Sequence, residues 1–166
     1  CSFIGVAQGR IPQEHWFLLG RQQAKVETGP PTLLSWSGSM FEYLMPNLLM
    51  PAYEGTLTGY ACRNAVEQQI IYGNKRKVPW GISESSYNLI DGRKTYQYRA
   101  FGVPDLGLMR GLSEDLVVAP YASVMGLLCM PLEACMNLQR MADDGVLGKM
   151  GFYEAVDYTA MRIPAG

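Results

Sequence analysis

Acidic side chains that stand among aromatic residues are the part of this sequence best suited to chemistry. Glu42 lies in Phe-Glu-Tyr, Glu84 follows Pro-Trp-Gly-Ile-Ser, and Glu154 follows Gly-Phe-Tyr. A pyranose ring has an apolar face that stacks on aromatic side chains, and its hydroxyls bind carboxylates, arginine and amides. Cleavage of a glycosidic bond needs one carboxylic acid and a second carboxylate. The pattern therefore favours a carbohydrate site.

Other aromatic, acidic and arginine side chains surround these acids in the sequence, and we expect them to contact the sugar. They are Trp36, Trp80, Tyr87, Tyr98, Arg99, Asp115, Tyr121, Tyr153, Asp157 and Tyr158. The alternative interpretation is that the tyrosine hydroxyls and the acids satisfy only the hydrogen bonds of loop backbones.

Glu84 is the strongest candidate for a general acid. It lies between Trp80 and Tyr87, where burial against an indole would raise its pKa and keep it protonated near neutral pH. Glu42 is expected to project from the apolar face of a helix into a polar cavity, because an unpaired buried carboxylate is costly. Glu154 and Asp157 share one face if their segment is helical, and are equally compatible with an exposed position.

Composition excludes several other kinds of site. The chain has 14 Lys and Arg against 15 Asp and Glu, which gives no basic surface for nucleic acid. Its four cysteines form no CxxC pair and its one histidine, His15, is expected to pack at a helix start, so neither a metal nor a cofactor is predicted. No dinucleotide, P-loop or GxSxG motif is present, and no 18-residue apolar stretch predicts insertion into a membrane.

Hydrophobic spacing predicts a chain of successive helices. Residues 36–50, with Ser39 as N-cap and a kink at Pro46, repeat at helical spacing, and helices are also predicted at 1–7, 56–73, 113–128 and 131–145. Ser113 is the expected N-cap of the fourth, and Pro131 suits the first turn of the last. Residues 74–112 are rich in Gly, Pro and aromatics and are expected to form one long ordered loop that serves a site. No strand of comparable length is predicted, which makes the expected fold class all-α.

Six segments of the chain carry a resemblance to a known family. In the expected order, they are residues 11–21, 34–46, 78–85, 96–104, 114–122 and 151–159. They resemble the glycoamylase-like central domain of cyclic β-1,2-glucan synthases, and they extend over nearly the whole chain.

The resemblance implies an (α/α)6 toroid built of helical hairpins with long active-site loops. Twelve helices of average length need roughly 200 residues, so residues 1–166 are expected to form an incomplete toroid with no internal domain boundary. Helices without their neighbours would then expose apolar stripes. Family enzymes are large proteins of the bacterial inner membrane, so the resemblance places this segment at the cytoplasmic face, as a soluble part whose partners are the remaining domains and β-1,2-glucan.

The resemblance also implies the reaction. The leading interpretation is transglycosylation that closes linear β-1,2-glucan into a ring, with Glu84 as acid and Glu42 or Glu154 as the second carboxylate. One alternative is an endo-β-1,2-glucanase, which would use the same acids with water as acceptor. Another is a non-catalytic glucan-binding or structural segment. We expect the 166 residues alone to be inactive.

Overall fold

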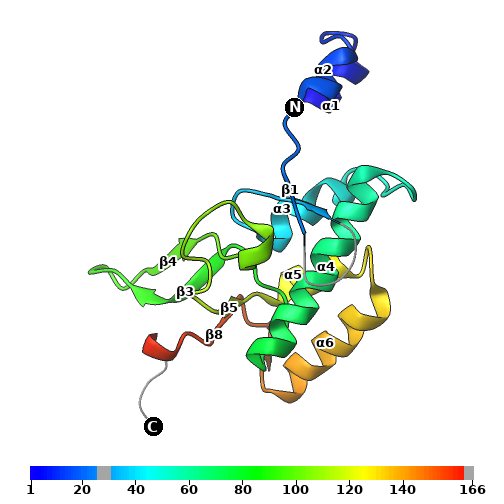
Figure 1. The fold of residues 1–166 in the computed structure, drawn as a ribbon. Coiled ribbons are helices and arrows are strands. Elements are labelled where there is room, and N and C mark those ends of the chain that lie inside the picture. Colours follow the sequence, from blue (N-terminus) through cyan, green and yellow to red (C-terminus); the bar gives the residue numbers. More distant parts are fainter. Residues whose placement is uncertain (26–30, 163–166) are drawn as a thin grey trace.

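The computed structural model describes residues 1–25 and 31–162. It contains six α-helices, short 3-10 helices and eight short strands within these ranges (Figure 1). In chain order they are α1 (Ser2–Ala7), α2 (Glu14–Leu18), β1 (Gln23–Ala24), β2 (Thr32–Leu33), α3 (Met40–Leu44), η1 (Met45–Leu48), α4 (Leu57–Arg76), β3 (Ser85–Ile90), β4 (Tyr96–Arg99), η2 (Pro104–Leu106), β5 (Val117–Val118), α5 (Pro120–Gly126), α6 (Pro131–Asp143), β6 (Leu147–Gly148), β7 (Gly151–Phe152), β8 (Val156–Asp157) and η3 (Ala160–Arg162).

The first two helices form a small pair that lies apart from the rest of the chain in Figure 1. Phe3 of α1 meets Trp16 of α2 edge to face, with 6.3 Å between ring centroids. The Ser2 hydroxyl lies 3.2 Å from Nε2 of His15, so the expectation that His15 packs at a helix start is confirmed. The predicted helix at 1–7 is also confirmed.

The predicted helix at 36–50 is shorter than expected. Ser39 is its N-cap, as predicted, because its side chain accepts a hydrogen bond from the backbone N–H of Glu42. The α-helix ends at Leu44, and Pro46 lies in the 3-10 helix η1. The proline therefore ends α3 and does not merely kink it, since it lacks the N–H that would continue the α-helical ladder.

The longest helix, α4, begins at the predicted place and ends later. The Thr56 side chain caps it, and Lys77 closes it in the left-handed region at φ 60°. The predicted end at Gly73 is wrong. Gly73 instead allows close packing, because a Cβ there would lie 3.1 Å from the Val78 carbonyl oxygen and from the Trp80 Cβ.

The predicted long loop at 74–112 contains a β-hairpin. Strands β3 and β4 pair antiparallel, with Ser85 opposite Arg99 and Ser86 opposite Tyr98. Asp91 shapes the connecting turn, because its carboxylate accepts hydrogen bonds from two backbone N–H groups of the turn. With β1–β2, β5–β8 and β6–β7 this makes four two-stranded sheets among the described residues. The longest elements are helices, but the fold is not all-α, because β5 contributes buried residues to the core.

The helix predicted to begin at Ser113 is also wrong at its start. The backbone N–H of Leu116 donates to the Thr159 hydroxyl, and the following residues form β5, which pairs with β8. The helix α5 begins only at Pro120. Partners from the far end of the chain therefore replace the helical hydrogen bonds that the Ser113 cap favours.

The core lies between α3, α4, α5, α6 and the segments that cross them. Its most deeply buried apolar side chains are Met40, Leu44, Val66, Ile82, Val103, Leu106, Val117, Val118 and Met141. The predicted helix at Pro131 is confirmed, and it packs against α5. Tyr87 of the hairpin and Val156 and Tyr158 of the C-terminal segment pack against this core.

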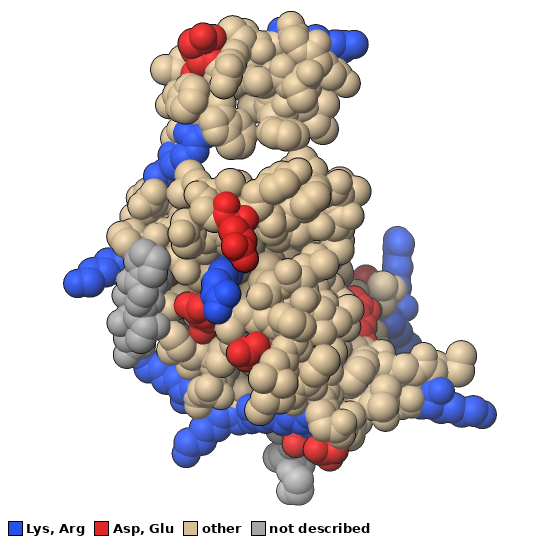
Figure 2. All heavy atoms as spheres, turned by 90° about the vertical axis from the view of Figure 1, so that its right-hand side faces the viewer, with Lys and Arg blue, Asp and Glu red and all other residues tan. Residues whose placement is uncertain are grey.

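One side of the molecule carries few charges (Figure 2). It is the side on which α6 lies in Figure 1. The elements η1, α4 and α6 expose apolar side chains, among them Leu48, Leu57, Leu132 and Met136. That missing neighbouring helices would cover them stays a prediction. No helix among the described residues is both long and apolar enough to cross a membrane.

Candidate active site

The segment that carries Glu84 is held by two buried carboxamides. Gln69 of α4 accepts from the Ile82 N–H at 2.8 Å and donates to the Ile82 carbonyl at 2.7 Å. Asn137 of α6 pairs in the same way with Trp80, accepting from its N–H at 3.1 Å and donating to its carbonyl at 2.8 Å. A non-helical segment thus crosses the core with its backbone groups satisfied.

The same segment is fixed again immediately before Glu84. The Ser83 hydroxyl accepts from the backbone N–H of Phe41 at the start of α3. The Tyr121 hydroxyl lies 2.8 Å from Oγ of Ser83 and 2.9 Å from the Glu84 carbonyl oxygen, to which it donates. The backbone of Glu84 is therefore positioned by α3 and α5, while its side chain remains partly exposed.

Glu84 and Glu154 lie within electrostatic reach of the same two tyrosines. Burial raises the pKa of Tyr121 to about 12, and the charges of Glu84 and Glu154 add to the increase. Partial burial and the same two carboxylates raise the pKa of Tyr98. Two of the three predicted catalytic acids, 70 positions apart in the sequence (84 and 154), are thus brought to one neighbourhood.

Glu154 lies on the wall of a cavity of about 560 Å³, a volume typical of ligand sites. Its carboxylate accepts from the backbone N–H of Ser86 at 3.0 Å, which ties the C-terminal segment to strand β3. Other walls come from Tyr87, Asn88 and Tyr153. Segment 153–155 is not helical and Glu154 is exposed, so of the two alternatives left open the exposed position holds for Glu154.

Glu42 faces a different group of residues. Its carboxylate accepts from the backbone N–H of Ser37 at 3.0 Å and from the Ser37 hydroxyl at 2.8 Å. The Glu42 residue is exposed, so the expectation that it projects into a buried polar cavity is wrong. Trp36, next to Ser37, is 66 % exposed.

Two of the predicted sugar-binding aromatics belong to the interior. Trp80 is only 5 % exposed, and its ring packs over Gly126, where a Cβ would lie 2.7 Å from the indole. Trp80 is therefore a core residue and not a surface for sugar stacking, while the predicted burial of Glu84 against its indole stays a prediction. Tyr158 packs partly buried against the same core, and burial raises its pKa. Tyr98 and Tyr153 are largely exposed.

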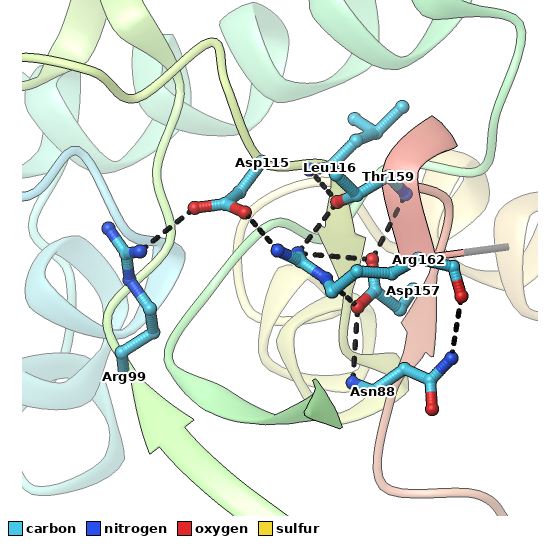
Figure 3. A network of polar contacts seen from close by, with 7 residues as sticks. All are labelled: Asn88, Arg99, Asp115, Leu116, Asp157, Thr159 and Arg162. Carbon is cyan, nitrogen blue, oxygen red and sulfur yellow. Dashed lines mark hydrogen bonds and ion pairs between the residues drawn. The ribbon is translucent and has the colours of Figure 1, made fainter. Parts of the chain in front are cut away.

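Three of the predicted sugar-binding residues form an ion-pair network with a residue that the sequence did not single out, Arg162 (Figure 3). Its guanidinium donates to Asp157 through Nε at 2.6 Å and to Asp115 through Nη1 at 2.6 Å. Arg99 completes the network with an ion pair to Asp115 at 3.0 Å. Arg162 follows no hydrophobic repeat or motif, so nothing in the sequence marked it.

Tyr87 and Tyr121 lie in the same region of the fold. The Tyr87 ring packs edge to face on Phe101, and the Arg162 guanidinium lies 4.9 Å from the centroid of the Tyr87 ring.

Within residues 1–25 and 31–162, no group of three His, Cys, Asp or Glu side chains is placed to hold a metal ion. The arrangement instead offers two carboxylates and aromatic rings, which suits acid–base chemistry on a sugar.

The Asp157 carboxyl should make the free energy of unfolding depend on pH in the acidic range. Burial alone would raise its pKa, but hydrogen bonds from Arg162, Thr159 and Asn88 outweigh burial and lower the pKa below its ordinary value of 3.8. A lowered pKa contributes stability that is present above the ordinary value and lost as pH falls through the lower folded-state value. As the pH is lowered through that range, we expect the urea concentration at the unfolding midpoint to decrease. The midpoint of Asp157→Asn should decrease less steeply. Parallel curves for the two proteins would contradict this assignment.

Comparison with known families gives a match over most of the chain. A family model described as "Glycoamylase: Putative glucoamylase" matches residues 5–164. The cyclic beta-(1,2)-glucan synthase NdvB of Rhizobium meliloti (strain 1021) is 45% identical over 165 residues, which is 99% of this chain and 6% of that protein. The chain thus spans a small part of the curated relative.

Solved structures share the fold at low identity. Two proteins with the same glucoamylase description, from Bacteroides caccae and Bacteroides fragilis, superpose with TM-scores of 0.57 and 0.56 at 20% and 22% identity. An endo-beta-1,2-glucanase from Chitinophaga pinensis, solved with sophorotriose and glucose, superposes with a TM-score of 0.56 at 18% identity. Each comparison covers 87% of this chain and 35% or 36% of the other.

Proposed function

Since this chain belongs to the glycoamylase family, we propose that it forms part of a carbohydrate-active domain that cleaves and re-forms bonds in β-1,2-glucan. The substrate class is supported by the 45% identity to a cyclic β-1,2-glucan synthase over 99% of this chain, which is 6% of that protein. The observation that supports the chemistry is the placement of Glu154 beside the Glu84 segment. The Glu154 carboxylate accepts from the Ser86 N–H, two residues after Glu84, and Tyr121 bonds the Glu84 carbonyl.

In the proposed reaction Glu84 is the general acid. It donates its proton to the glycosidic oxygen as the bond from that oxygen to the anomeric carbon breaks. Glu154 is the second carboxylate and forms or supports the glycosyl intermediate, with Glu42 as the alternative for this role. In transglycosylation a hydroxyl of the same glucan chain attacks the anomeric carbon and returns its proton to Glu84. One bond is broken and one formed, so no water is consumed.

Hydrolysis is the second candidate, and the exposure of the site favours it. Tyr98 and Tyr153 are about 60 % exposed, so the described chain leaves the neighbourhood of Glu154 open to solvent. Water would then replace the sugar hydroxyl as acceptor. Exclusion of water by the rest of the polypeptide would favour ring closure.

We also propose that α3 to α6 belong to an (α/α)6 toroid that other segments complete. This is supported by the solved relatives, of which the chain covers 35% to 36%. The proposed setting is the cytoplasmic face of the bacterial inner membrane, with the remaining domains of a larger synthase as partners. The proposed sugar contacts are the exposed or cavity-lining residues Trp36, Tyr87, Tyr98 and Tyr153, together with the partly buried Tyr121 next to Glu84.

Product analysis tests the proposed function. The complete polypeptide that contains this chain is incubated with linear β-1,2-glucan, without a sugar nucleotide, and the products are separated by mass spectrometry. We expect cyclic glucans, each lighter than its linear counterpart by one water, and no turnover by the 166 residues alone. Linear oligosaccharides as sole products would support the endo-glucanase instead. Unchanged glucan would reject both enzymatic functions.

A further inference from the structure

Arg162 joins segments that lie far apart in the sequence. Its guanidinium bonds Asp157 in β8 and Asp115 in the segment before β5. Its backbone carbonyl accepts from the side-chain amide of Asn88 in β3 at 2.8 Å. Figure 3 shows these polar contacts, and the same guanidinium also lies over the Tyr87 ring. One residue therefore connects the C-terminal segment to the hairpin and to the core.

The charges that Arg162 compensates are poorly exposed. The Asp157 side chain is 5% exposed and that of Asp115 is 12% exposed. Arg162 donates to Asp157 through both Nε and Nη2, a two-point geometry that fixes the carboxylate plane. Removal of the guanidinium leaves Asp157 without an ion-pair partner in the network, which destabilises that arrangement.

Asp157 and Glu154 make matching contacts to the same strand. The Asp157 carboxylate accepts from the Asn88 N–H at 3.1 Å, and the Glu154 carboxylate accepts from the Ser86 N–H at 3.0 Å. Both N–H groups donate to the C-terminal segment, so the two carboxylates hold β3 at two positions, and we call these two contacts clamps. Arg162 holds the Asp157 clamp directly.

We propose that Arg162 is a positioning residue for Glu154, which acts by fixing the Asp157 clamp and the cavity wall formed by Tyr87 and Asn88. This inference rests on the proposed function, because it concerns the geometry of the same site. Arg162 does not touch the substrate. It keeps the Glu154 carboxylate aligned with the bond that reacts, and a small misplacement of a catalytic group costs roughly 10²-fold in rate.

The test uses Arg162→Ala in the complete polypeptide, with Arg63→Ala as the matched control. Arg63 is an exposed residue of α4, and its ion-pair partner is Glu67 of the same helix and not Asp115 or Asp157. We expect Arg162→Ala to lower kcat by roughly 10²-fold with little change in KM. Millimolar guanidinium should restore part of the lost rate, because it can occupy the site between Asp115 and Asp157. Arg63→Ala should retain the parental kcat in both conditions.

Two outcomes would overturn the inference. One is a parental kcat for Arg162→Ala. The other is a loss that guanidinium does not restore, which assigns a purely structural role. If Arg162→Ala does not fold, Arg162→Lys replaces it: a lysine keeps the charge but cannot make the two-point contact. A lowered kcat at unchanged KM then supports the inference, and a parental kcat rejects it.

Failure of the proposed function gives a separate result. In that case the unsubstituted polypeptide leaves β-1,2-glucan unchanged, and hydrogen exchange at residues 86–88 reports on the clamps directly. Faster exchange there in Arg162→Ala than in Arg63→Ala shows that Arg162 positions the Glu154 segment even though the glucan assignment is wrong. Equal exchange rejects the positioning role as well.

Discussion

Replacing Glu84 with glutamine lowers the turnover of linear β-1,2-glucan by about 10²- to 10⁴-fold, the usual contribution of a general acid. Glutamine has the same shape but has no acidic proton to donate to the glycosidic oxygen. The fold around residue 84 should survive, because Tyr121 bonds its backbone carbonyl and not its carboxylate. Gln69 and Ser83 hold the preceding residues independently of that side chain. The loss is therefore chemical, and is measured as kcat in the complete polypeptide.

The kinetic constants separate this role from a mere contact. Loss of a general acid lowers kcat, whereas loss of a mere binding contact raises KM, so Glu84→Gln should lower kcat with little change in KM. Glu54→Gln is the control, since Glu54 is an exposed glutamate in the loop before α4. A parental rate in Glu84→Gln with unchanged glucan binding would mean that Glu84 is not the acid.

Local signals in the sequence predicted local structure well. The Ser39 cap, the start of α4 and the first-turn proline of α6 are each decided by a few neighbouring residues, and each is confirmed. The hairpin β3–β4 was missed because much of it is exposed on both faces, so its hydrophobicity does not alternate. A register shift between Ser86 and Ile90 further weakens the pattern.

The sequence predicts which residue types form the site, but not the direction in which each side chain points. Acids among aromatics predict a site around Glu84 and Glu154, which stays a prediction, but sequence does not show which aromatic ring faces the core. The Trp80 ring lies in the core, and the hydroxyl of Tyr121 bonds the Glu84 backbone. The residues that hold the site, Gln69, Asn137 and Arg162, look like ordinary polar residues in a sequence, because their partners are backbone groups or acids distant along the chain.

Replacing Gln69 with alanine should destabilise the protein more than any substitution of an exposed residue. Gln69 is fully buried, and its carboxamide serves both the N–H and the carbonyl of Ile82, with a longer contact to the Gly81 N–H at 3.3 Å. The Met40 N–H also donates to the Ile82 carbonyl, so that oxygen keeps one partner. The two N–H groups are left unsatisfied, and each such buried group costs about 1–3 kcal/mol. We expect the free energy of unfolding to fall by about 3 kcal/mol or more once the cavity left by the side chain is included.

Gln139→Ala is the matched control for this substitution. Gln139 lies on the exposed side of α6, where its amide bonds only the Asp143 side chain, so its loss should change the free energy of unfolding by less than about 0.5 kcal/mol. Urea unfolding compares the two variants, and hydrogen exchange at Gly81 and Ile82 localises the effect. Equal midpoints would show that water or a shifted backbone replaces the carboxamide. The segment that presents Glu84 would then be held by Asn137, Ser83 and Tyr121 alone.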